Sequence, residues 1–242
     1  MSLTGIFLCT FLIVHMVGNL QVFKSDGGFA FNKYAVLMTT NPLIKTVSYG
    51  LYAMILFHAF WGLYLEIQNR KARPQRYAYV KNSSSWASRN MAVLGTILLV
   101  FIAVHMGVFW FDYKFGHVPY KEYIENVKTG ELISQQAMPE EYTQTVKQIE
   151  YTDEAAGTRR VIVKDLYYEV AESFENPILV VFYVLSMLVL SYHLVHGFQS
   201  AFQTLGINHP KYSPFIKAIG LWVFAILIPI GFAAMPIYFF IK

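Results

Sequence analysis

Five apolar runs set the limits on what this chain of 242 residues can fold into. They cover residues 3–23, 42–67, 90–111, 177–203 and 214–241. Because a helix rises about 1.5 Å per residue, each run can cross a hydrocarbon core of about 30 Å. With 55% hydrophobic and only 14% charged residues, the chain offers no separate soluble domain. The sequence therefore predicts an all-α transmembrane fold, a five-helix bundle in the lipid bilayer, with residues 1–242 forming one membrane domain.

Proline marks the start of three of these helices. The pairs Asn41-Pro42, Asn176-Pro177 and Ser213-Pro214 each place a capping side chain before a proline at the first helical position. Pro229 and Pro236 predict kinks in the fifth helix. The first run lacks a basic lead and a cleavage site, so we expect a retained helix, and its abrupt start predicts that a leader precedes the numbered chain.

The distribution of charge predicts the topology. Residues 68–89 contain six basic side chains and no acid, whereas residues 112–176 contain 13 of the 15 acids. The positive-inside rule places the basic loop in the cytoplasm and the acidic one outside, as an extracytoplasmic loop or small cap. Five spans then put the N terminus inside and the C terminus outside. Topology and anionic lipid explain the basic cluster, so no nucleic-acid partner is expected. The single Cys9 excludes a disulfide framework.

The segments between the helices give weaker signals. Residues 24–40 are expected to form an outer loop with a turn at Gly27-Gly28. Within residues 112–176, the long outer loop between the third and fourth helices, the pattern favours a hairpin over 148–163 and a helix over 163–174.

Histidines are the readily titratable groups deep in four of the five runs. His15, His58 and His105 each lie alone in a run, and the stretch SYHLVHGFQSAFQTLG (191–206) contains two, His193 and His196. An ionisable ring in hydrocarbon is costly and indicates a function. His58 and His196 lie 12 residues from the inner ends of their helices, counted from Arg70 and Asn208. His15 and His105 lie 13 and 16 residues in, counted from Ser2 and Arg89, so the depths predict an inner and an outer pair.

Two imidazoles from facing helices can bind the iron of a six-coordinate haem suited to electron transfer. This favours a haem-binding four-helix core made by the first four helices. His193 and His196 are about 60° apart around one helix, so only one can bind the same iron. We expect His196 to be the ligand because Gly197 beside it lets a flat macrocycle approach the backbone. His193 would support the site, carry protons or contact a neighbouring helix.

Other classes of protein are compatible with buried histidines. A transporter or proton channel is one, but proton paths usually include carboxylates, and none lies in 3–22 or 177–203. A zinc site is disfavoured because the runs contain no tight ligand cluster. A structural anchor without haem is another alternative.

The chain resembles a known family, the single-chain, five-helix, diheme cytochrome b anchor of succinate dehydrogenase or fumarate reductase, in its Bacteroidetes-type form. The resemblance spans all five helices and rests on SLTGIFLCTFLIVHMVGN, NPLIKTVSYGLYAMILFHAFWGLYLEIQNRKARP, SSSWASRNM and SYHLVHGFQSAFQTLGINHPKYSP. It implies two haem b groups, the distal iron held by His15 and His105 and the proximal iron by His58 and His196.

The resemblance also implies the partners and the reaction. The chain would lie in the bacterial cytoplasmic (inner) membrane and bind a flavoprotein subunit and an iron–sulfur subunit, which alone contain FAD and the iron–sulfur clusters; the family also allows a dimer of complexes. It would be the electron-transfer and quinone-reacting subunit of a succinate:quinone oxidoreductase, with menaquinone as its substrate and no succinate chemistry of its own. A cytochrome b subunit of a hydrogenase or formate dehydrogenase is the nearest alternative.

Two features depart from the family pattern. Relatives have a basic stretch before SLTG, and some use glutamates at the outer end of the first helix and just before the fourth-helix histidine. Here the second place has Tyr192 and His193, and Asp26 is the acid near the first. Asp26, Tyr34 and Trp110 are candidate outer groups for the quinone, and no catalytic residue is assigned.

Overall fold

The computed structural model describes residues 1–72 and 85–242, and these contain five helical segments long and apolar enough to cross a membrane. The first is α1 (Ser2–Asn19) with the short 3-10 helix η1 (Leu20–Phe23), and the second is α3 (Pro42–Ala72). The third consists of α5 (Met91–His105), the π-helix η2 (Met106–Phe111) and α6 (Asp112–Phe115), preceded by α4 (Trp86–Arg89). The fourth is α8 (Pro177–Thr204), and the fifth is α9 (Ser213–Ile219), the π-helix η3 (Gly220–Leu227) and α10 (Ile228–Ile241).

Two of the three predicted helix starts have the expected cap. The Asn41 side chain accepts hydrogen bonds from the backbone N–H groups of Leu43 and Ile44, and Asn176 caps α8 in the same way. The third prediction was wrong in its detail, because Ser213 is already the first residue of α9. Its hydroxyl donates to Asn208 Oδ1 at 3.0 Å instead, across the turn that joins α8 to α9.

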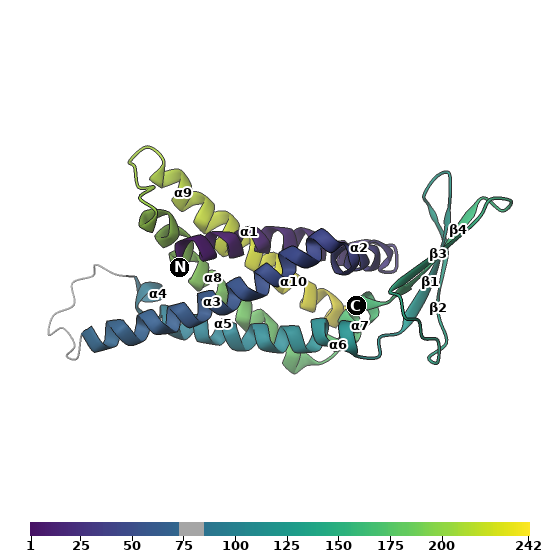
Figure 1. Ribbon diagram of the computed structural model, residues 1–242, viewed down its shortest axis with the longest axis horizontal. Coiled ribbons are helices and arrows are strands. Elements are labelled where there is room, and N and C mark those ends of the chain that lie inside the picture. Colours follow the sequence, from purple (N-terminus) through teal and green to yellow (C-terminus); the bar gives the residue numbers. More distant parts are fainter. Residues whose placement is uncertain (73–84) are drawn as a thin grey trace.

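Helix α8 lies at the centre of the bundle. It packs against α1, α5, α10 and η3 (Figure 1). The main core contains side chains from these elements, among them Met16, Tyr183, Leu194, Phe198 and Phe224. The Ser191 hydroxyl donates to the Ala225 carbonyl in η3, which ties α8 to the fifth span.

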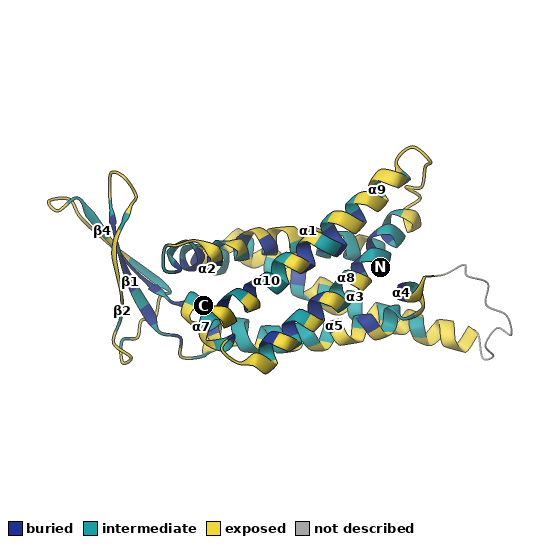
Figure 2. Ribbon diagram, turned by 180° about the vertical axis from the view of Figure 1, so that it is seen from behind, coloured by how far each residue is buried: buried dark blue, intermediate teal, exposed yellow. Residues whose placement is uncertain are grey.

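The outward faces of the spanning segments are apolar and exposed. Figure 2 shows exposed and half-buried residues along the helices, and in α3 only Leu51 is buried. Large side chains such as Leu43, Phe60, Ile178 and Ile230 are each more than 60% exposed. A surface of this kind is stable against lipid chains and not against water. The fold is therefore that of a helical, multi-pass membrane protein.

The segment 112–176 corrects the expectation of an all-α protein, because it contains a four-stranded antiparallel sheet. The strands β1 (Tyr120–Asn126), β2 (Leu132–Ala137), β3 (Gln148–Asp153) and β4 (Thr158–Lys164) lie in the order β2-β1-β4-β3. The predicted hairpin is confirmed as β3 and β4, and the predicted helix as α7 (Leu166–Ser173). The first two strands were not predicted.

A second correction concerns residues 24–40. Gly27 and Gly28 form the expected turn, with φ of 63° and 89°, but the chain then enters α2 (Phe29–Thr40) instead of a loop. Asn32 in α2 is fully buried and donates to Tyr123 Oη in β1 at 3.1 Å and to Asp165 Oδ1 before α7 at 2.7 Å. These bonds attach the sheet and α7 to the bundle.

The molecule has two distinct ends (Figure 1). At the sheet end lie α2, α7, the four strands and the C terminus. At the other end, here called the basic end, lie the N terminus, the α8–α9 turn and the Arg70, Lys71 end of α3. The predicted basic residues Arg73, Arg76 and Lys81 lie outside the described residues.

Candidate functional site

Two histidine rings from α1 and α5 face each other inside the bundle. The ring centroids of His15 and His105 are 5.8 Å apart, and their planes are nearly perpendicular, at 89°. His15 lies near the end of α1, and His105 is the last residue of α5, so this pair is the one nearer the sheet end. The structure thus brings together the two residues that the depth count assigned to the outer pair.

Aromatic side chains enclose this pair. Phe11 stacks on His15 at a centroid distance of 5.1 Å, and Phe101 stacks on His105 at 5.7 Å. The Tyr183 hydroxyl lies 3.3 Å from His105 Nδ1. On the other ring, Asn19 Nδ2 is 3.3 Å from His15 Nδ1. Both Nδ1 atoms therefore have a polar neighbour, which leaves the two Nε2 atoms for another partner.

A second pair forms between α3 and α8, and it differs from the expected one. The ring that faces His58 is His193, at a centroid distance of 6.4 Å and an interplanar angle of 64°. Among the described residues, the ring contacts of His58 do not include His196. The two α8 histidines are three residues apart, so their side chains leave the helix about 60° apart, and the packing of α8 directs His193 toward α3 and α5. Sequence reasoning assigned His193 only a secondary role.

The proton of His58 can be placed from its neighbour. The Thr4 hydroxyl lies 2.9 Å from His58 Nδ1 and donates its single hydrogen to the Met1 carbonyl at 2.7 Å. When the Thr4 hydroxyl donates to Met1, its oxygen can accept from His58 Nδ1–H, and Nε2 of the neutral ring then has a free lone pair. Metal-binding histidines generally have this arrangement, in which the second ring nitrogen donates to a protein oxygen.

His193, unlike His58, has a ring nitrogen without a hydrogen-bond partner among the described residues. This nitrogen is the Nδ1 atom, and it is buried. Since an unpaired buried polar atom is costly, this ring is incompletely satisfied by the protein alone. The unpaired nitrogen lies on the ring that faces His58.

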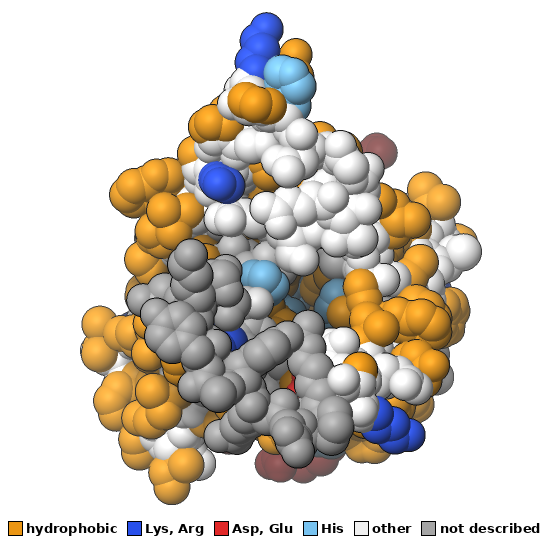
Figure 3. All heavy atoms as spheres, turned by 90° about the vertical axis from the view of Figure 1, so that its left-hand side faces the viewer, with side chains coloured by type: hydrophobic (Ala, Val, Ile, Leu, Met, Phe, Trp, Pro, Cys, Tyr) orange, Lys and Arg blue, Asp and Glu red, His pale blue; other side chains and the backbone are white. Residues whose placement is uncertain are grey.

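Small residues leave room around the second pair. A Cβ atom added to Gly5 would lie 3.6 Å from His58 Cε1, and one added to Gly95 would lie 3.7 Å from His193 Cε1. Beside Thr4, which contacts His58, the basic end contains an open cavity of about 600 Å³. It is lined by Met1, Ser2, Leu3, Thr4, Met54, Phe57 and Leu205. Figure 3 shows this end face on, with histidine side chains visible near its middle. The volume is within the range of pockets that bind cofactors.

The two pairs lie at different depths. Thr4 contacts His58, and His15 lies eleven residues further along the same helix, so the pairs are separated by roughly 16 Å along α1. No group of three or more His, Cys, Asp or Glu side chains suited to a metal ion occurs in residues 1–72 and 85–242. The arrangement consists of two-histidine sites, which suit the axial positions of a macrocycle-bound iron better than a zinc ion.

The other residues considered from the sequence have local contacts. Asp26 accepts hydrogen bonds from the N–H groups of Gly28 and Ala30, where α2 begins. Tyr34 packs on Gly18, and the Trp110 ring contacts Tyr52 at 5.8 Å. All of these lie at the sheet end. None of them is brought into ring contact with a histidine pair.

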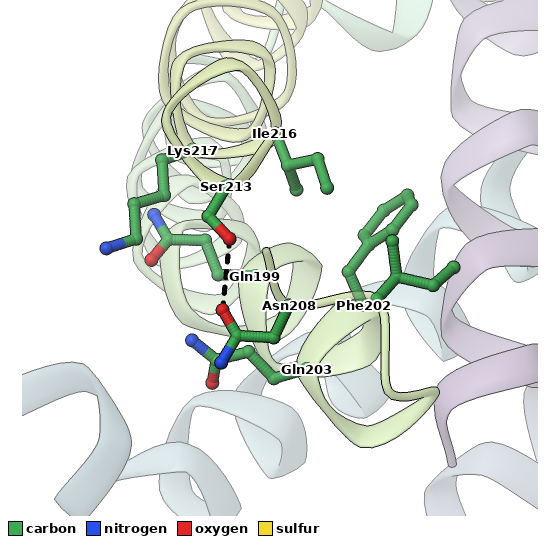
Figure 4. Close-up of a pocket in the computed structure, with 8 residues that line it drawn as sticks. Gln199, Phe202, Gln203, Asn208, Ser213, Ile216 and Lys217 are labelled. Atoms are coloured by element: carbon green, nitrogen blue, oxygen red, sulfur yellow. Dashed lines mark hydrogen bonds between the residues drawn. The ribbon is translucent and has the colours of Figure 1, made fainter. Parts of the chain in front are cut away.

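A small hollow at the α8–α9 turn has no functional shape. It is lined by Gln199, Phe202, Gln203, Ile207, Asn208, Ser213, Ile216 and Lys217, and its volume is about 10 Å³ (Figure 4). That is room for no more than one water molecule. The hydrogen bond between Ser213 and Asn208 crosses it. We therefore assign it to the turn and not to a ligand.

Comparison with known proteins adds no relative. No family model matches the chain, and the searches of curated proteins and of solved structures give no match. The helical, multi-pass membrane class rests on the five apolar helices, and the particular function rests on the two histidine pairs.

Proposed function

We propose that this chain is the cytochrome b membrane-anchor subunit of a succinate dehydrogenase or fumarate reductase complex, with two haem b groups. The observation that carries the proposal is the presence of two facing histidine pairs at different depths, His15 with His105 and His58 with His193. When bound, the haems would supply one-electron transfer across the membrane, between an iron–sulfur subunit and menaquinone.

The geometry of both pairs fits this cofactor. Two imidazoles brought close together from different helices are the residues that would hold one haem iron. The observed separations are 5.8 and 6.4 Å. The open cavity of about 600 Å³ beside Thr4 leaves space for part of a guest between α1 and α3.

The ligand on α8 is proposed to be His193 in place of His196. His193 faces His58 and has a buried nitrogen without a partner among the described residues, whereas no ring contact joins His196 to His58 there. The remaining ligands His15, His58 and His105 are as expected from the sequence. Thr4, Tyr183 and Asn19 would orient them.

Haem quantification on the purified chain tests the proposal. We expect two low-spin b haems per polypeptide, and a preparation without haem after expression in a haem-competent host would contradict it. Replacing His193 with Ala should remove one haem, and the matched variant His196→Ala should retain both. The reverse result would return the assignment to His196. Absorbance and electron paramagnetic resonance spectra report the ligand loss independently of activity.

The partners are tested by isolating the complex from its membrane. A flavoprotein with covalent FAD and an iron–sulfur protein should co-purify with a tagged chain. Co-purification of a hydrogenase or formate dehydrogenase instead would assign the same haem-binding fold to the alternative class.

A further inference from the structure

Four lysines gather at the sheet end, where the bundle meets the strands. Lys45 lies in the first turn of α3 and Lys114 in α6, while Lys147 precedes β3 and Lys164 ends β4. We call these residues the lysine cluster. The chain segments that provide them are far apart in sequence, so the fold itself assembles the group.

Two aromatic rings organise the cluster. The Nζ atoms of Lys147 and Lys164 lie 4.5 and 5.5 Å from the centroid of the buried Tyr113 ring. Lys114 Nζ lies 4.8 Å from the centroid of the Trp110 ring. These cation–π contacts hold three ammonium groups around the end of the third span.

Lys45 reaches the same place from α3. The Tyr52 and Trp110 rings are in contact at 5.8 Å. Lys45 is seven residues, or two turns, before Tyr52 on the same face of α3, and Lys114 is about one turn beyond Trp110. Both lysines therefore extend past this aromatic contact, in the direction of the sheet.

Ion pairs among the described residues do not neutralise the lysine cluster. None of the four lysines forms an ion pair within the described part of the chain. Lys164 donates to the carbonyls of Tyr113 at 2.8 Å and Gly116 at 3.3 Å, and Glu169 is the acid that acts on it electrostatically. Burial, followed by repulsion from the other three lysines, lowers the pKa of Lys147 to about 8.

We propose that the lysine cluster binds the phosphate of an anionic phospholipid headgroup. Its geometry provides several charge-assisted donors to one anion. A lipid is favoured over a free phosphate because two of the lysines lie at the ends of membrane-spanning segments, next to exposed apolar side chains. Phe111 and Phe115 are 53% and 62% exposed there, and Leu43 is 73% exposed. Lysines just beyond an aromatic layer are at the depth of headgroups.

Native mass spectrometry of the full chain in detergent tests this proposal, with phosphatidylglycerol and phosphatidylcholine as the added lipids. We expect selective binding of phosphatidylglycerol, weakened about fivefold for each lysine removed and so roughly 25-fold in Lys114→Gln/Lys147→Gln. The control variant Lys128→Gln/Lys211→Gln changes the net charge equally at exposed sites away from the cluster. It should bind like the wild type.

Further arms separate the outcomes. Lys147→Arg should retain binding, since it keeps the charge. If the double variant does not fold, the single variant Lys114→Gln is the readout, with an expected loss of about fivefold. Equal binding of both lipids, or equal loss in the cluster and control variants, would overturn the proposal. Binding of inorganic phosphate without a preference for phosphatidylglycerol would overturn the assignment to lipid. Haem content is measured in parallel and should not change, so this test is independent of the proposed function.

Discussion

Thr4 is the residue whose hydroxyl contacts Nδ1 of His58. Replacing it with Val keeps the shape of the side chain and removes the oxygen that accepts from Nδ1–H. We expect retention of the haem at the His58 pair to fall about tenfold, as for other partners of metal-binding histidines. Haem titration of the purified variant measures this. Thr10→Val is the matched control, because Thr10 bonds only to the Ile6 carbonyl on the exposed face of α1. A similar loss in both variants would show that Thr4 acts through helix stability.

The sequence identified three of the four paired histidines and did not decide between two residues for the fourth, where we expected His196. His15, His58 and His105 are each alone in an apolar run, so their position in the bundle followed from spacing alone. His193 and His196 share one helix, and an angle of about 60° separates two equally plausible ligands. Only the fold distinguishes them, because it places the His193 ring against His58 of α3. Gly197 adjoins His193 as well as His196, with a Cβ placed there 4.0 Å from His193 Cδ2, so it favoured neither residue.

At the scale of elements, Gly18 lets α1 and α2 approach each other. A Cβ atom at this position would overlap the Tyr34 ring. Gly18→Ala should therefore lower stability by about 1–2 kcal/mol, the usual cost of overpacking. Thermal unfolding in detergent measures this. The control is Gly50→Ala, because a Cβ atom at Gly50 in α3 meets open space. Adding Tyr34→Ala to Gly18→Ala should recover the stability lost in the single variant. If it does not, the cost arises within α1 and not from the contact.

The attachment of the sheet to the bundle should depend on pH through Asn32. Burial raises the pKa of the Asp165 carboxyl, and the hydrogen bond from Asn32 opposes that rise. Asn32→Ala removes a donor whose hydrogen bond to Asp165 is strongest while that carboxyl is ionised. The loss should therefore be about 2 kcal/mol above the folded-state pKa of Asp165 and should shrink as the pH falls and the carboxyl is protonated.

Thermal unfolding followed from pH 8 down to pH 4 measures this difference. A loss of that size corresponds to roughly 4–8 °C for a chain of this length. In an Asp165→Asn background the effect of Asn32→Ala should no longer vary with pH. If the loss caused by Asn32→Ala did not vary with pH even with Asp165 present, the role of Asn32 would lie in its contacts with Tyr123 and the Tyr167 N–H.

The missed elements have a physical explanation. Strand β1 buries Glu122 and Glu125, which pair with Arg160 and Arg159 on β4. A strand that buries acids does not show the alternation of apolar and polar residues on which prediction depends. In α2, the buried position 32 is the polar residue Asn32, so the apolar face of the helix is not continuous in the sequence. The length and apolar composition of the spanning helices predict them from sequence alone. Strand β1 and helix α2 bury polar residues whose partners lie in other segments, so their sequences alone do not predict them.

In the whole molecule, the two histidine pairs lie toward opposite ends of the bundle and have different surroundings. One pair lies near the sheet end among aromatic side chains, and the other lies next to the cavity at the basic end. A separation of roughly 16 Å along α1 divides the hydrocarbon core about in half. The proposed function requires the sheet end to lie on the outer side of the membrane and the basic end on the cytoplasmic side.

That orientation is the last prediction. Five spans place the sheet and the α8–α9 turn on opposite sides, and the acids at the sheet end favour the outside. In a Cys9→Ala background, a membrane-impermeant maleimide should label Lys128→Cys in intact cells, and Asn208→Cys only after permeabilisation. Both positions are exposed, so access depends on the membrane alone. The opposite pattern would put the sheet in the cytoplasm and place the cavity beside His58 on the side away from an iron–sulfur subunit. Labelling of both in intact cells would contradict an odd number of spans between the two ends.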